Sequence, residues 1–298
     1  MKRITIFGGT GFLGRRLVCC LARGGYLPRI AVRRPLPELF SDIETEQLRC
    51  DVGDPRAVAA ALNGADGAVN AVGLYVENRA HRFHQVHVDA AREIAAQAVS
   101  GGLRLVHISG IGADPGAASS YIRARGQGEA AVRAAAPEAV ILRPSALFGH
   151  DDGFLSSLTG LVEALPVIPL FGRGDTRLQP VHVDDVALAV ARIFDLERPP
   201  ANLFELGGPR SYCYRELLAL IAAVRRRRRW FMPMPFVIWE LLALLLAQLP
   251  QRPLTRDQVA LMRRDNVTAA DIAGFAELGI EPRALQDLLI AGKSETGV

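Results

Sequence analysis

The stretch that decides the fold is Ile4-Thr5-Ile6-Phe7-Gly8-Gly9-Thr10-Gly11-Phe12-Leu13-Gly14. A short apolar run leads directly into glycines with the spacing G-x-x-G-x-x-G, and an amphipathic helical pattern follows. A tight turn from a strand into a helix needs residues without a Cβ atom, and a pyrophosphate needs close backbone approach and the amide donors of a helix N-terminus. A plain glycine-rich turn is the alternative, but strand, glycines and helix stand in the order that the motif demands. We therefore expect a dinucleotide to bind at Gly8, Thr10, Gly11, Phe12, Leu13 and Gly14.

The first half of the chain alternates short apolar runs with longer helical patterns, which is typical of β-α-β units and a parallel sheet. The expected strands cover residues 3–7, 29–33, 46–50, 67–72, 103–109 and 138–142, and the expected helices cover 11–24, 55–62, 83–100 and 119–135. The strand runs are continuous rather than alternating, so helices should cover both faces of the sheet. The sequence predicts an α/β fold: a Rossmann-type doubly wound parallel sheet with a smaller, mainly helical C-terminal part.

The composition of the sequence changes near residue 150, where glycines and prolines begin to interrupt short elements. We expect a dinucleotide-binding domain over residues 1–150, to which residues 177–200 return. Residues 151–176 and 201–298 are then expected to form a C-terminal part that binds substrate or a partner.

Composition excludes several classes of function. The 298 residues include 35 basic and 31 acidic side chains, a formal net charge of +4, and this small excess argues against a nucleic-acid partner. Lys2 and Lys293 are the only lysines, so 35 − 2 = 33 of the basic residues are arginines. The body of the fold therefore has no lysine for a Schiff base or a phosphate loop.

The four cysteines form no C-x-x-C pair, which argues against a structural metal and against a disulfide framework. Residues 4–7 are too short an apolar stretch for a signal peptide, and we expect a cytoplasmic protein. Histidines recur at positions 81, 84 and 87, but three imidazoles at this spacing drift around a helix. We expect no metal site, and a solvated helix start with His87 facing the cofactor.

The end of the second strand indicates which cofactor is preferred. Sites for NAD(H) place an acidic residue there to bind the ribose 2′-hydroxyl, but this chain has Arg33-Arg34-Pro35. A guanidinium pairs with a 2′-phosphate through two parallel hydrogen bonds and stays charged. Neighbouring arginines are also common in so arginine-rich a chain. The sequence favours NADP(H) over NAD(H), with Arg33 and Arg34 as ligands.

Further motifs resemble the short-chain dehydrogenase/reductase superfamily in its extended or atypical branch, the NAD-dependent epimerase/dehydratase type. They follow the expected strands in order: Asp51-Val52, Asn70-Ala71-Val72-Gly73, Arg143-Pro144-Ser145 with Gly149, and residues 181–187 and 204–209. Residues 107–115, 254–259 and 265–267 are similar to the NADPH-binding accessory subunits of respiratory complex I and their bacterial relatives. The resemblance implies that Asp51 and Val52 contact adenine, that residues 70–73 lie beside a ribose, and that Pro144 and Ser145 lie near the nicotinamide.

The resemblance also implies a catalytic group. Hydride-transferring members use a serine, a tyrosine and a lysine four residues after the tyrosine. Here Ser109 ends the fifth strand, Tyr121 follows twelve residues later, and Arg125 holds the lysine position, on the same helix face as the tyrosine. A cation near a tyrosine favours tyrosinate, but a guanidinium cannot readily give up a proton. Ser109 and Tyr121 are either an impaired acid/base pair or residues that only bind cofactor and backbone, and Tyr121 and Arg125 are expected to bind the cofactor in either case.

Residues 225–249 join five arginines to a long apolar run. Pro233 and Pro235 should stop a helix, and the remaining residues 236–249 would be about 21 Å long, against a hydrocarbon core of roughly 30 Å. Three interpretations stay open: burial in the protein, a wall of an apolar substrate pocket, or contact with a membrane surface or a membrane-protein partner.

Two functions of different class follow. The first is a weak or specialised NADP(H)-dependent oxidoreductase acting on an apolar, quinone- or isoprenoid-like substrate. The second is a non-catalytic NADPH-binding accessory or assembly factor of a membrane respiratory complex. Either would place the protein in the cytoplasm, peripheral at the inner face of a membrane.

Overall fold

The computed structural model describes residues 1–77, 81–247 and 254–289. The chain divides into two compact units that interleave along the sequence. The first unit consists of Met1–Pro144, Val183–Leu206 and Ala270–Glu281, and the second consists of Ser145–His182, Gly207–Ala269 and Pro282–Val298. The predicted domain boundary at residue 150 and the predicted return of residues 177–200 remain predictions.

The first unit is built on a seven-stranded parallel sheet with the order β11-β6-β5-β4-β1-β2-β3. The strands are β1 Arg3–Phe7, β2 Leu27–Val32, β3 Glu46–Arg49, β4 Gly67–Asn70, β5 Arg104–Ile108, β6 Val140–Pro144 and β11 Leu203–Leu206. The order reverses between β1 and β4, and in such sheets ligands bind at the carboxyl ends of the strands beside this reversal. The predicted doubly wound α/β fold is confirmed.

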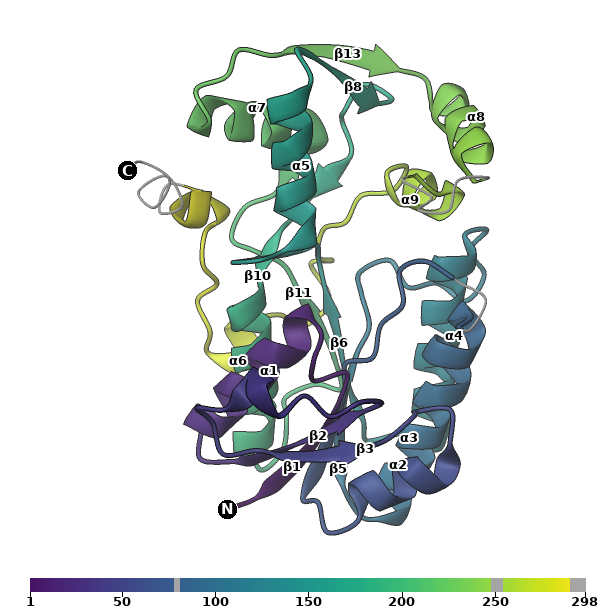
Figure 1. Cartoon of the computed structure of the whole chain (residues 1–298), viewed down its shortest axis with the longest axis vertical. Coiled ribbons are helices and arrows are strands. Elements are labelled where there is room, and N and C mark those ends of the chain that lie inside the picture. The colour runs from purple at the N-terminus through teal and green to yellow at the C-terminus, as the bar shows by residue number, and fades with distance from the viewer. Residues whose placement is uncertain (78–80, 248–253, 290–298) are drawn as a thin grey trace. The chain divides into compact units, whose positions relative to one another are not determined.

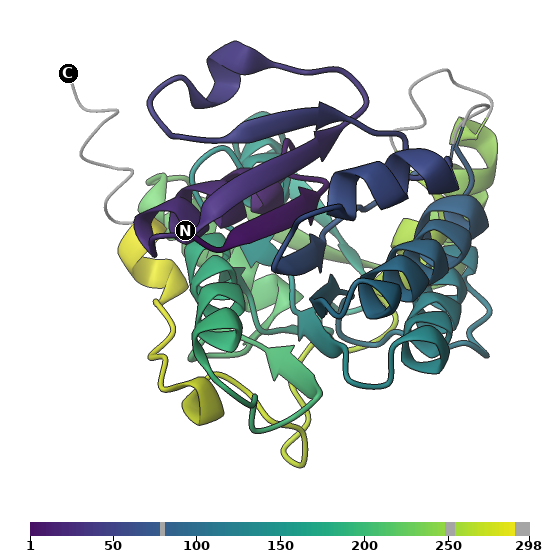
Figure 2. The same ribbon diagram turned by 90° about the horizontal axis from the view of Figure 1, so that it is seen from below.

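Helices cover both faces of this sheet (Figures 1 and 2). One face carries α1 (Phe12–Arg23) and α6 (Val183–Asp195), and the other carries α2 (Pro55–Leu62), α3 (Ala90–Ser100) and α4 (Ser120–Ala135). Short helical turns occupy Pro37–Phe40 and Ala276–Leu278. The central strands bury Ile4, Ile6, Phe7 and Ile30 almost completely, as continuous apolar runs predict for a sheet covered on both faces.

The helix expected over residues 83–100 begins with a π-helical turn, η2 (Gln85–Asp89), before α3. This turn packs against α4 at Gly128, where a Cβ atom would collide with His87 O. Because the contact is between two helices far apart in sequence, the local pattern could not reveal the change of helix type.

The described part of the second unit contains three two-stranded sheets, β10-β7, β12-β9 and β13-β8, the helices α5, α7, α8 and α9, and helical residues at 285–289. Its elements are β7 Leu147–Phe148, α5 Gly153–Ala164, β8 Val167–Phe171, β9 Arg177–Leu178, β10 Val181–His182, β12 Tyr212–Cys213, α7 Tyr214–Val224, β13 Trp230–Met234, α8 Phe236–Leu246 and α9 Arg256–Leu261. The core of this unit lies between α5, α7 and β8. Helices predominate in its second half, as predicted.

The prolines at 233 and 235 do stop a helix: Met234 ends β13, and Pro235 is the N-cap of α8. Residues 248 and 249 of the predicted stretch lie outside the described residues. Among the described residues, no helix is long and apolar enough to cross a membrane.

Two glycines inside helices, one in each unit, test the packing of Gly128 against η2 in the first unit. Gly128→Ala is expected to destabilise the protein by about 1–3 kcal/mol, because the new methyl group collides with the backbone of η2. Gly160→Ala in α5 is the control: nothing lies within 4 Å of its Cβ position, so alanine should stabilise by about 0.5–1 kcal/mol. Urea unfolding would measure both effects, and equal effects of the two substitutions would contradict the packing.

Candidate nucleotide and catalytic site

The glycine turn after β1 is closed by backbone contacts that leave no room for side chains. Gly8 has φ +83°, in the left-handed region, and a Cβ atom there would lie 2.6 Å from Ala71 O. A Cβ atom on Gly14 would collide with Gly8 O. Gly11 donates its N–H to Gly8 O at 3.1 Å and is the N-cap of α1. The backbone therefore requires glycine at positions 8 and 14, whereas a Cβ atom on Gly11 would lie 3.4 Å from Gly8 O, at an ordinary contact distance.

The N-terminus of α1 is open to an anion. No described side chain caps it, and its first turn contains no acidic residue, so the first amide groups keep their hydrogen-bonding capacity. The helix dipole adds partial positive charge at this end. Thr10 lines the adjacent pocket, Phe12 is half-buried and Leu13 is buried. This arrangement suits a pyrophosphate.

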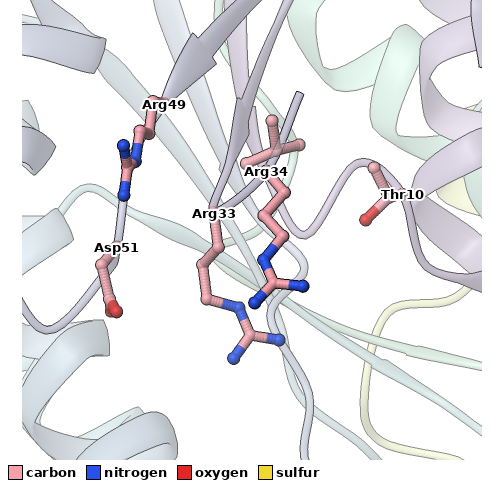
Figure 3. A pocket seen from close by; sticks show the side chains of 6 residues that line it. Thr10, Arg33, Arg34, Arg49 and Asp51 are labelled. Carbon is pink, nitrogen blue, oxygen red and sulfur yellow. The ribbon is translucent and has the colours of Figure 1, made fainter. Parts of the chain in front are cut away.

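A pocket of about 590 Å³ lies beside the turn, within the size range of ligand sites. Its lining residues are Thr10, Val32, Arg33, Arg34, Arg49 and Asp51. Figure 3 shows Arg33 and Arg34 extending from the end of β2, with Thr10 on one side and Arg49 and Asp51 on the other. Three guanidiniums and one carboxylate make this a cationic pocket suited to an anionic group.

Arg49 is the pocket residue that sequence reasoning missed. It ends β3 and pairs with Val32 in the parallel register of β2 and β3, so it stands beside the predicted arginines. Its place at the carboxyl end of the neighbouring strand, two residues before Asp51, was a signal that could have identified it. Arg33 Nη1 contacts His81 Nε2 at 2.6 Å, and no described carboxylate lies within ion-pair distance of Arg33, Arg34 or Arg49.

The residues predicted to lie beside the adenine and the ribose occupy the carboxyl ends of β3 and β4. Asp51 Oδ1 accepts a hydrogen bond from Gly53 N at 3.0 Å, and Val52 packs on the core. Asn70 is buried and contacts His107 Nδ1 at 3.2 Å through Nδ2, while its Oδ1 accepts from Val72 N. Asn70 thus braces β4 against β5.

Beyond Asn70, the segment after β4 approaches the glycine turn and then opens. Ala71 closes on Gly8, whereas a Cβ atom on Gly73 would meet nothing within 4 Å. Open space therefore begins at Gly73, since Val72 still packs on the core.

Ser109, Tyr121 and Arg125 come together in the first unit, at the end of β5 and on α4. Arg125 Nη1 donates to the Tyr121 hydroxyl oxygen at 2.9 Å, so the tyrosine's own O–H must point elsewhere. Ser109 Oγ and Arg125 Nε are buried and have no hydrogen-bond partner among the described residues. The guanidinium packs on Gly110, where a Cβ atom would lie 3.2 Å from Nη2. Buried polar atoms without partners indicate a place for a bound group, and together with the glycine turn they fit a dinucleotide.

Burial affects the protonation of Tyr121 more strongly than the neighbouring Arg125 cation does. Burial raises the pKa of Tyr121 and outweighs the opposing effect of Arg125, so the expected shift toward tyrosinate does not prevail. The pKa of Arg125 is raised by its interaction with the two tyrosines Tyr121 and Tyr75, against the effect of burial. At neutral pH the pair is a protonated phenol beside a guanidinium cation.

Two histidines beside Arg125 are held neutral. Burial, reinforced by the Arg125 charge, lowers the pKa of His87 to about 4 and that of His107 to about 3. His87 packs edge-on against Tyr121, with ring centroids 5.8 Å apart, and its Nε2 lies 3.0 Å from Leu74 O. His87 does turn toward Tyr121, but it is buried, so the expectation of a solvated helix start does not hold for this residue.

Pro144 and Ser145 fall in different units. Pro144 ends β6 and accepts a hydrogen bond from Ile111 N at 3.2 Å. Ser145 begins the second unit, where its Oγ lies 2.5 Å from Asn266 Oδ1. Their predicted place near the nicotinamide remains a prediction.

No group of three histidine, cysteine or carboxylate side chains among the described residues is arranged to hold a metal ion. His84 contacts Asp89 at 3.1 Å, and His81, which lies before the helix, contacts Arg33. All four cysteines are free thiols.

A Rossmann sheet, a side-chain-free glycine turn at its switch point and a cationic pocket beside it define a nicotinamide-dinucleotide-binding protein of the short-chain dehydrogenase/reductase type. The chain belongs to the NAD dependent epimerase/dehydratase family, whose profile matches residues 4–207. Members of this family bind NAD(P).

Relatives of known name fall into two groups. The chain is 35% identical over 218 residues to the ceramide reductase of Caulobacter vibrioides, covering 72% of this chain and 68% of the relative. It is 30% identical over 291 residues to NADH dehydrogenase (ubiquinone) 1 alpha subcomplex subunit 9, mitochondrial, of Mus musculus, covering 95% and 77%. Its fold is similar to that of MoeE5 in complex with UDP-glucose and NAD, with a TM-score of 0.72, 18% identity and coverage of 99% and 98%.

The two neutral histidines predict how stability depends on pH. An unfolded histidine titrates near pH 6.5, well above the folded values, so below that pH the unfolded chain binds more protons. The stability that each neutral histidine contributes is therefore full only well above pH 6.5, and it falls as the pH drops from 7 to 5, by about 2 kcal/mol per histidine. Urea unfolding of His107→Gln should show a pH dependence smaller by about that amount, and an unchanged dependence would contradict the burial of a neutral imidazole.

Proposed function

We propose that this chain binds NADP(H) in preference to NAD(H) and reduces a carbonyl group of an apolar, quinone- or isoprenoid-like substrate. The observation that carries the proposal is the hydrogen bond of 2.9 Å from Arg125 Nη1 to the Tyr121 hydroxyl, together with the buried, unpartnered hydroxyl of Ser109, which precedes the Gly110 on which Arg125 packs. Serine and tyrosine hydroxyls in this arrangement can hold a substrate oxygen and give it a proton. Because burial keeps Tyr121 protonated, the group suits proton donation, the direction of a reduction.

The roles of the chain's own residues follow from their chemistry. The Gly8–Gly14 turn and the N-terminus of α1 would bind the pyrophosphate, and the bound NADPH would supply a hydride to the carbonyl carbon. Tyr121 donates its proton to the carbonyl oxygen as negative charge develops there, and Ser109 hydrogen-bonds the same oxygen. Arg125 stabilises the tyrosinate that remains, and solvent restores the proton.

Arg125 limits the turnover rate that such a site can reach. A lysine can donate and accept a proton, whereas a guanidinium stays charged at working pH. Return of the proton to Tyr121 therefore needs a path that does not run through Arg125. This argument supports a weak or specialised enzyme rather than a fast one.

The apolar character of the substrate is supported by the relative named ceramide reductase, since a ceramide is a lipid. A substrate of this class dissolves in membranes, so we place the reaction in the cytoplasm, at the inner face of a membrane. NADP(H) preference is supported by Arg33 and Arg34, joined by Arg49, around one pocket.

The second candidate is a non-catalytic NADPH-binding accessory or assembly factor of a membrane respiratory complex. It is favoured by similarity over 95% of the chain to a subunit of NADH dehydrogenase (ubiquinone), and by arginine in the lysine position. In this role the bound nucleotide would stabilise the folded state by mass action.

Replacing the pocket arginines tests the cofactor preference. Arg33→Gln, Arg34→Gln and Arg49→Gln should each raise the Kd for NADPH about tenfold, since each removes a charge-assisted contact to the 2′-phosphate, and should leave the Kd for NADH nearly unchanged. Arg133→Gln on the exposed surface of α4 is the control. Isothermal titration would measure both cofactors, and an equal loss for NADH and NADPH would sink the 2′-phosphate assignment.

Replacing the acid tests catalysis. Tyr121→Phe keeps the ring but removes the proton, so turnover of NADPH with short-chain quinones and lipid ketones should fall by at least about a hundredfold, while the Kd for NADPH changes little. Arg125→Lys should retain or raise turnover, whereas Arg125→Met should lose it. Tight NADPH binding with no turnover on any substrate of the panel would favour the accessory role.

A further inference from the structure

The outer surface of α8 is apolar without interruption. Its exposed side chains follow helical spacing and belong to Val237, Ile238, Leu241, Leu244 and Leu245, with exposed fractions of 71%, 43%, 55%, 54% and 62%. Glu240 is the one ionisable residue of the helix, and it lies at the edge of this face, where its side chain is 43% exposed and pairs with Arg263. A surface helix ordinarily turns polar residues outward, whereas α8 exposes to water the kind of apolar face that such a helix normally buries.

The outward orientation of this face is fixed by Trp239 on the opposite side of α8, and a surface ion pair flanks the face. Trp239 Nε1 donates to Leu170 O at 3.0 Å, and the Trp239 ring packs on Phe171 with centroids 4.3 Å apart. Glu240 pairs with Arg263 at 2.8 Å. The helix therefore cannot turn its leucines inward without breaking these contacts.

Further exposed apolar side chains lie on β13, the strand that precedes α8 in the chain. Trp230 is 80% exposed and Met232 is 48% exposed, and Val167, the parallel partner of Trp230 on β8, is exposed beside it. An indole ring at the edge of an apolar face is the side chain that settles at a membrane–water interface. Contiguous exposed apolar surface of this extent marks an interaction site.

Uncompensated positive charge adjoins this surface. The loop 225–229 leads directly into β13, and Figure 1 shows the loop, β13 and α8 following one another along one edge of the second unit. Arg225 lies 3.7 Å from Glu163, and Arg229 binds the backbone oxygens of Val162 and Glu163. Arg226, Arg227 and Arg228 are exposed, and in the described chain no carboxylate lies within ion-pair distance of them.

We propose that α8, Trp230 and Met232 insert into the surface of an anionic lipid bilayer, with Arg226, Arg227 and Arg228 against the headgroups. The positive charge favours a lipid bilayer over other partners. Three unpaired guanidiniums would add nothing to the binding of a purely apolar protein partner or a second copy of this chain, but they would bind the phosphates of anionic headgroups. A helix of 11 residues, about 16 Å long, lies in the interface rather than across the membrane. The inference rests on the proposed membrane location and not on the proposed reaction.

Vesicle binding of the full chain tests the surface. Co-sedimentation is expected with phosphatidylcholine vesicles containing about 30% phosphatidylglycerol and to be at least about tenfold weaker with phosphatidylcholine alone. The fluorescence of Trp230 should shift to shorter wavelength on binding, and Trp230→Phe should abolish this shift, because Trp239 is already packed. Absence of binding to the anionic vesicles would overturn the proposal.

Variants separate the apolar and the charged contributions. Leu241→Gln/Leu245→Gln should weaken binding about tenfold or more, since it places polar groups on the inserted face, whereas Val99→Gln/Leu196→Gln on exposed apolar positions of the first unit is the matched control. Arg226→Gln/Arg227→Gln/Arg228→Gln should remove the preference for anionic lipid and its sensitivity to salt. Equal effects of the apolar pair and its control would contradict insertion through α8.

Two further measurements distinguish the failures. If sedimentation shows a dimer that Leu241→Gln/Leu245→Gln makes monomeric while vesicle binding is unchanged, a second copy covers the face and the lipid proposal is wrong. NADPH affinity and turnover, measured on the same variants in detergent-free buffer, should not change. Vesicle binding without NADPH turnover would support the membrane-binding surface and contradict the proposed reaction. NADPH turnover without vesicle binding would support the reaction and contradict the membrane-binding surface.

Discussion

The site depends first on the close approach of three backbone segments at the end of β1. Gly8 lies against Ala71, and Gly14 lies against Gly8, with no space for a Cβ atom at either glycine. This contact brings the uncapped N-terminus of α1 to the switch point of the sheet, where its amide groups face the ligand side. The arginine pocket at the ends of β2 and β3 and the Ser109–Tyr121 pair after β5 lie along the carboxyl edge of the same sheet.

Arg125 creates the second constraint. A buried cation is costly unless an opposite charge or hydrogen bonds compensate it. Among the described residues it has one hydrogen bond, to Tyr121, and Glu129 on the same helix is engaged by Arg143 at 2.6 Å. The neighbouring imidazoles of His87 and His107 remain neutral for the same electrostatic reason. In a chain with lysine only at positions 2 and 293, the cation beside Tyr121 is a guanidinium, which can donate hydrogen bonds but cannot readily give up a proton.

The two units differ in which of their side chains lie in an unfavourable environment. In the first unit it is polar and buried, at Ser109 Oγ and Arg125 Nε. In the second unit it is apolar and exposed, on α8 and at Trp230. Unpartnered polar atoms inside a protein and apolar side chains in water are both costly, so both features point to contacts outside the chain.

The sequence by itself determined the parallel sheet, the glycine turn, and the pairing of Tyr121 with Arg125, because apolar runs, glycine spacing and helical periodicity are local properties. It did not predict β11, the π-helical turn at His87 or the role of Arg49, each of which depends on neighbours distant in the chain. The sequence did not show the direction of the Tyr121 pKa shift either, because the shift depends on burial, which outweighs the charge of the adjacent Arg125. Three interpretations of residues 225–249 were open because their composition suits a core as well as a surface. Only the folded chain decided that the leucines of α8 face outward, through the contacts that hold Trp239 inward.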